Sequence, residues 1–142
     1  MTVTFFGNRD AREDIKLELR ETLIKLITQD GADTFYVGNN GNFDRMVIGQ
    51  LIKLQKEYPH INYSVVLAYF PKENPTDELK DKTIYPESVG KGPARFAVCR
   101  RNDWMINNAE TVVTYTKYTF GGAEQYKQVV IKKNKKVIEL FE

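Results

Sequence analysis

The fold is decided by the stretch TFYVGNNGNFD, residues 34–44. Residues 34–37 are β-branched or aromatic, which is typical of a short strand, and a turn rich in glycine and asparagine follows directly. Beyond the turn, apolar residues recur at helical spacing: Phe43, Val47, Leu51, Leu54 and Tyr58. The stretch therefore predicts a strand, a glycine loop and a helix in immediate succession.

The same alternation continues on both sides of this stretch. Residues 2–6 predict a strand that stops at a second glycine turn, and a helix follows with Asp10 as its N-cap and Gly31 as its end. Residues 71–93 contain four prolines and little periodicity, so they predict an irregular connection. It could be a binding loop or simply a loop exposed to solvent. The remaining predicted elements are strands at 62–70, 111–116 and 136–141 and helices at 94–109 and 122–133.

This order of elements predicts the α/β class, with one Rossmann-like domain over residues 1–142. Right-handed crossovers between parallel strands lead us to expect a five-stranded, mainly parallel sheet of order 3-2-1-4-5, with helices on both faces. The length of 142 residues suits one domain, and 42% hydrophobic with 28% charged residues gives no indication of disorder.

Charge and cysteine content limit the possible partners. Lys and Arg exceed Asp and Glu by 21 to 19, and much of that excess is the lysine run at 132–136, so we expect no general nucleic-acid-binding surface. The single cysteine, Cys99, leaves no disulfide or metal cluster, so neither a metal nor a cofactor is expected. With no long apolar run, we expect a cytoplasmic protein without membrane contact.

The candidate site lies where the predicted strands end, because ligands of such sheets bind beyond the carboxyl ends of the strands. Glycine allows close backbone approach, and the helix that follows offers free N–H groups to an anion such as phosphate. The candidate ligand-binding residues in these loops are Gly7, Asn8, Arg9, Gly38, Asn39, Asn40, Gly41, Asp44, Gly121, Gly122 and Ala123. Any one loop could simply be a tight turn, and it is the convergence of three loops that favours a ligand site.

Several side chains keep two interpretations at this stage. Arg9 could bind phosphate or pair with a nearby surface carboxylate, and Asp44 could hold the start of its helix or accept a ribose hydroxyl. Trp104 and Tyr85 could stack on a base, although a single Trp on an apolar helix face more often belongs to the core. No loop matches the patterns of dinucleotide or P-loop sites, and one histidine without a G-x-S-x-G turn argues against a hydrolase triad.

Four segments together resemble a known family. They are FGNR at 6–9, GNNGNFD at 38–44, RNDWM at 101–105 and GGA at 121–123. In this combination the chain resembles the SLOG superfamily of Rossmann-like proteins, which is related to the lonely guy phosphoribohydrolases and to the DprA and YpsA groups. The resemblance implies a pocket that binds or senses a nucleotide or nucleotide-derived ligand, and a homo-oligomeric assembly.

The hydrolase branch of that family supplies the alternative function, an N-glycosidic hydrolase that acts on nucleoside monophosphates. It uses an arginine on the helix before strand four and a glutamate in a P-G-G-x-G-T-x-x-E motif. Arg101, followed by Asn102, falls at the arginine position, so the resemblance implies that both bind ligand and that Arg101 and Glu124 would be catalytic in an enzyme. Residues 120–125, FGGAEQ, lack the motif's proline, third glycine and threonine, which favours binding over turnover.

Overall fold

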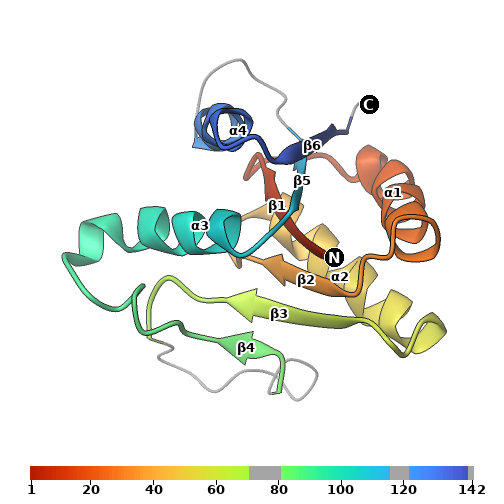
Figure 1. Ribbon diagram of the computed structural model, residues 1–142, viewed down its shortest axis with the longest axis horizontal. Helices are drawn as coiled ribbons and strands as arrows, with labels where there is room; N and C mark the ends of the chain where they lie inside the picture. Colours follow the sequence, from red (N-terminus) through yellow and green to blue (C-terminus); the bar gives the residue numbers. More distant parts are fainter. Residues whose placement is uncertain (71–80, 116–121, 141–142) are drawn as a thin grey trace.

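The chain forms a parallel sheet of six strands with helices on both faces (Figure 1). The computed structural model describes residues 1–70, 81–115 and 122–140, without the side chains of 122–125 and 127. The strands are β1 (Thr2–Gly7), β2 (Thr34–Val37), β3 (Asn62–Val66), β4 (Thr83–Ile84), β5 (Thr111–Tyr115) and β6 (Lys136–Glu139). The helices are η1 (Glu13–Ile15), α1 (Lys16–Thr28), α2 (Asn42–Glu57), η2 (Ala94–Phe96), α3 (Ala97–Asn107) and α4 (Gly122–Lys132).

The strand order β4-β3-β2-β1-β5-β6 confirms the predicted Rossmann-like α/β fold and corrects the number of strands from five to six. The added strand, β4, lies within the connection that we expected to be irregular. It pairs in parallel with the end of β3, with Val65 opposite Thr83 and Val66 opposite Ile84. Two residues are too few to show an alternating pattern, so only the tertiary pairing reveals this strand.

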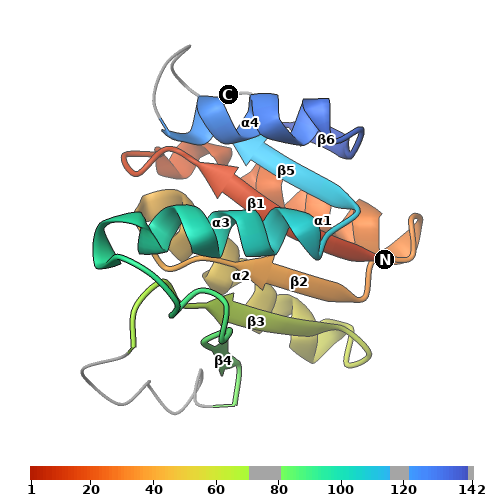
Figure 2. The same cartoon turned by 60° about the vertical axis from the view of Figure 1, so that its left-hand side comes forward.

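Each face of the sheet carries its own hydrophobic core. Helices α1 and α2 cover one face and α3 and α4 the other, as Figure 2 shows. The predicted first helix is present as α1, and its apolar residues Leu19, Leu23 and Leu26, which recur at helical spacing, are buried in the core of this face. On the opposite face Met105 and Ile106 of α3 pack with residues of β1, β3, β5 and α4. Because both cores pack helices against strands, they hold the first turns of the helices in place beside the ends of the strands.

Two element boundaries differ from the expectations. Asp10 does not cap the first helix, because helical backbone begins only at Glu13 and neither η1 nor α1 has a side-chain cap bond. The Ala11 N–H instead donates to the Asn8 carbonyl at 3.2 Å, so the chain turns once more before the helix. Strand β3 ends at Val66, and the chain up to residue 70 continues outside the strand. None of the described helices is long and apolar enough to span a bilayer.

Candidate functional site

The loops after β1 and β2 lie against each other at the carboxyl edge of the sheet. A Cβ on Gly7 would overlap the ring of Phe43 in the first turn of α2. Gly41 has φ of 96°, and a Cβ there would lie 2.6 Å from the Arg9 Cα. The Asn42 N–H donates to the Arg9 carbonyl at 2.8 Å, which joins the two loops directly. The glycines therefore allow the two loops to pack together, as their convergence at this edge requires.

Arg101 reaches the same edge from α3. Its side chain is 3% exposed, and its Nε donates to the Asn102 Oδ1 at 2.7 Å. Its Nη1 donates to the Val66 carbonyl at 3.2 Å and to the Asn39 Oδ1 at 3.4 Å. These acceptors lie at the ends of β3 and β2, so the guanidinium bridges two neighbouring strand ends. Within the described part of the chain, the Arg101 Nη2 donates to no other residue.

Gly38 is the residue over which Arg101 and Asp44 meet. A Cβ on Gly38 would lie 2.8 Å from the Arg101 Nη1 and 3.0 Å from the Asp44 Oδ2, so both groups rest against its backbone. The Asp44 Oδ2 also accepts the Asn40 N–H at 2.9 Å, which holds the loop at the start of α2. Asp44 thus stabilises the helix start, as one of its two interpretations predicted, although from the first turn rather than from the N-cap.

Burial governs the electrostatics of this pair. It raises the pKa of Asp44 to about 6, an effect that the Asn40 N–H and the charge of Arg101 only partly oppose. Burial also lowers the pKa of Arg101 from its ordinary value, while the charge of Asp44 acts in the other direction. Arginine stays protonated in proteins, so the site contains a buried cation beside a carboxylate that is easily neutralised.

The remaining predicted site residues surround this centre to different extents. Arg9 is exposed, and two of its possible surface partners, Glu13 and Asp14, are paired with other residues at 3.9 and 3.7 Å. Asn8 is partly exposed. Helix α4 begins with Gly122, Ala123 and Glu124 on the side to which β1 and β5 point (Figure 2), whereas Gly121 lies outside the described residues.

The two aromatic residues with open interpretations have different surroundings. Trp104 is partly buried and packs edge-on against Tyr36, with ring centroids 4.9 Å apart, so its role is in the core. Tyr85 remains partly exposed and contacts Phe70. The sequence did not single out Tyr69 or Phe70, because both fall inside the predicted strand 62–70 and become exposed only because β3 ends at Val66.

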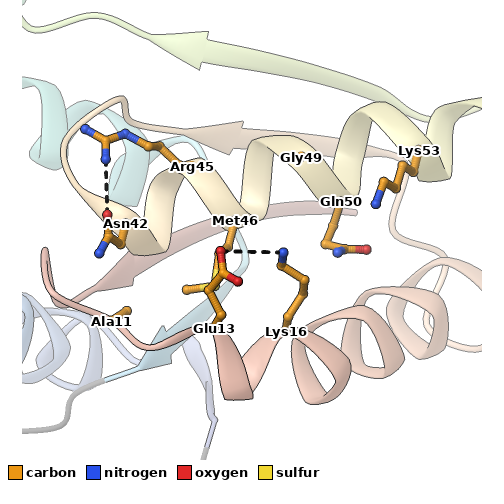
Figure 3. Close-up of a pocket in the computed structure, with 9 residues that line it drawn as sticks. All are labelled: Ala11, Glu13, Lys16, Asn42, Arg45, Met46, Gly49, Gln50 and Lys53. Atoms are coloured by element: carbon orange, nitrogen blue, oxygen red, sulfur yellow. Dashed lines mark hydrogen bonds and ion pairs between the residues drawn. The ribbon is translucent and has the colours of Figure 1, made fainter.

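A separate hollow of about 340 Å³ lies between α1 and α2 (Figure 3). Lys16, Arg45 and Lys53 give it a basic lining, and Glu13 adds one carboxylate, which lies 3.9 Å from the Lys16 Nζ. The Arg45 guanidinium donates to the Asn42 Oδ1 at 3.1 Å. Sequence reasoning missed this hollow, and its one signal is the recurrence of its α2 lining residues at helical spacing between 42 and 53.

Comparison with known proteins bears on the fold. No protein-family model and no curated protein sequence matches this chain. Among solved structures, DNA processing protein A (DprA) from Streptococcus pneumoniae superposes with a TM-score of 0.58. The chain has a DprA-like Rossmann fold. The alignment covers 96% of this chain but 58% of DprA, at 13% sequence identity, so the likeness is one of fold.

Proposed function

We propose that this DprA-like domain binds a nucleotide or nucleotide-derived ligand at the carboxyl edge of its sheet, with a phosphate beside Arg101 and the 38–41 loop. The observation that carries the proposal is the buried guanidinium of Arg101. A buried charge is costly unless it is paired, yet within the described residues the hydrogen-bond acceptors of Arg101 are neutral amide and backbone oxygens. Among the described residues, Asp44 is the carboxylate that acts on the pKa of Arg101, yet the two groups form no ion pair within 4 Å. A phosphate would supply the missing anion.

The start of α2 supports the same placement. Gly41 is the N-cap residue and provides no side-chain cap. The Asn42 N–H donates to the Arg9 carbonyl, so the N–H groups of Phe43 and Asp44 are the ones at this helix start that an anion could reach. Such an N-terminus favours an anion through its free N–H groups and its dipole. Because Gly38 has no side chain, the Arg101 guanidinium can rest against the backbone of this loop, next to the start of α2.

We further propose that the chain is SLOG-like and binds its ligand without turnover. The residues that carry this proposal are those of the resemblance, and the degraded FGGAEQ segment argues against the hydrolase branch. Homo-oligomeric assembly and a cytoplasmic location stay predictions. The DprA neighbour is named for DNA processing. For this chain we propose a mononucleotide-sized ligand, because the net charge of +2 does not favour a general nucleic-acid surface.

The test is calorimetric titration of the protein with AMP, followed by ADP-ribose and a cyclic nucleotide as further probes. Arg101→Lys keeps the charge but loses the planar fork, so we expect it to weaken AMP binding by about tenfold, the scale of one lost charge-assisted bond. Arg9→Ala should weaken binding less, because Arg9 is exposed. Arg12→Ala removes the same charge three residues away and should leave affinity unchanged. Absence of binding by all three probes to the wild type would overturn the proposal.

A further inference from the structure

Exposed aromatic side chains gather at the same edge of the sheet. Six large hydrophobic side chains are exposed among the described residues. Two are aliphatic, Leu17 on α1 and Ile131 on α4. The others are all aromatic and form what we call the aromatic cluster: Tyr69 (52% exposed), Phe70 (76%), Tyr85 (36%) and Phe96 (49%). Tyr69 and Phe70 follow β3, Tyr85 follows β4, and Phe96 ends η2 just before α3. Figure 1 shows β2, β3 and β4 pointing to the side on which α3 begins.

The rings of the aromatic cluster are held in place by specific contacts. Phe70 and Tyr85 pack edge-on, with ring centroids 6.0 Å apart and planes at 74°. The Tyr69 hydroxyl donates to the Ala94 carbonyl at 3.1 Å, which ties the chain after β3 to η2. The Arg95 guanidinium lies 4.9 Å from the centre of the Phe96 ring. The cluster is thus a built surface that combines aromatic faces with a cation.

The aromatic cluster also lies close to Arg101. The Val66 carbonyl that accepts from Arg101 is three residues before Tyr69, a length of chain that spans at most about 10 Å. Tyr69 is near enough to contribute to the electrostatic environment of Arg101. A ligand whose phosphate lay at Arg101 would therefore extend its remaining part over these rings or toward the loop after β1.

We propose that the aromatic cluster is a base-stacking subsite, in which Tyr69 and the Phe70–Tyr85 pair receive the nucleobase of the ligand whose phosphate lies at Arg101. The inference rests on the proposed function and deepens it, because it states how the base is recognised. Every nucleobase offers a flat aromatic face, and exposed rings flanked by arginine suit stacking with little preference among bases. A purely apolar protein partner fits less well, since tyrosine hydroxyls and the Arg95 cation interrupt the apolar area.

The test compares AMP with ribose 5-phosphate, which lacks the base. The wild type should bind AMP at least about tenfold more tightly than ribose 5-phosphate, the scale of one stacked base. In Phe70→Ala and Tyr69→Ala that preference should fall toward one, with the affinity for ribose 5-phosphate unchanged. Phe70→Trp should retain it, because the ring face remains. Leu17→Ala, which truncates an exposed side chain on α1, is the matched control.

The outcomes separate the two proposals. Equal affinity of the wild type for AMP and ribose 5-phosphate would overturn the stacking subsite and leave phosphate binding intact. If neither compound bound, the subsite would be overturned, and the proposed function would fail with it if ADP-ribose and the cyclic nucleotide also did not bind. If Phe70→Ala instead abolished a concentration-dependent self-association while the AMP preference persisted, the aromatic cluster would be an interface between copies of the chain, and the subsite would be refuted. Phe70 is 76% exposed, so its truncation should leave the fold intact.

Discussion

Titration of Asp44 should make the folded chain more stable as the pH falls from 7 toward 4. Its pKa in the folded state is about 6, against 3.8 for a free side chain, because burial penalises the carboxylate. The folded state therefore binds the proton more tightly than the unfolded state, and the contribution of this group to stability declines as the pH rises through 6. A shift of about two units, at about 1.4 kcal/mol per unit, corresponds to roughly 3 kcal/mol between pH 4 and pH 7.

The perturbation that isolates this effect is Asp44→Asn, which is nearly isosteric, does not titrate and keeps an oxygen for the Asn40 N–H. Urea unfolding of both proteins, followed by circular dichroism at pH 4, 5, 6 and 7 and constant ionic strength, gives the difference in unfolding free energy at each pH. Relative to the wild type, the variant should gain about 3 kcal/mol of stability between pH 4 and 7. If the difference in unfolding free energy between the two proteins did not change with pH, the reasoning would be refuted. A wild type that gains stability relative to Asp44→Asn as the pH rises would show that attraction between Asp44 and Arg101 outweighs burial.

Two further predictions concern glycines and turnover. Gly41→Ala should destabilise the fold by about 1–3 kcal/mol, because φ is 96° and the added Cβ would meet the Arg9 backbone. Gly49→Ala, in the middle of α2 with open space around it, should instead stabilise the fold by up to about 1 kcal/mol. Thermal unfolding measures both changes. Equal effects of the two substitutions on stability would contradict the claim that Gly41 is required by its positive φ and by the nearby Arg9 backbone. Incubation with AMP should release no free adenine by chromatography. Release that is lost in Glu124→Gln would restore the hydrolase interpretation.

The arrangement of the sheet was predictable because its signals are local. Each of the first two strands ends at a glycine turn, and the helices that follow show apolar stripes that the structure buries, as at Leu19 and Leu51. Strand β4 was not predictable. It has only two residues, in a segment rich in proline, and they form a strand only because they pair with β3. The Asp10 cap was wrong because the backbone bond between Ala11 and Asn8 delays the helix, and residue preference alone does not show such a bond.

Ligand binding at the carboxyl edge stays a prediction, whereas the nearness of the named residues to one another there is visible in the structure. The rule for parallel sheets pointed to the strand ends, and the resemblance pointed to Arg101. The sequence could not show that Arg101 and Asp44 both rest against the backbone of Gly38, or that burial would raise the pKa of Asp44 to about 6. The aromatic cluster was missed because the exposure of Tyr69 and Phe70 depends on where β3 ends.

The most direct test of ligand binding at the carboxyl edge is an amide correlation spectrum of ¹⁵N-labelled protein titrated with AMP. The central claim predicts saturable shifts at the amides of Gly38, Asn39 and Gly41, which surround the proposed phosphate position. Little change is expected at Gly49 and Lys53, which line the hollow between α1 and α2. Shifts confined to that hollow, or no shifts at high AMP concentration, would contradict the claim.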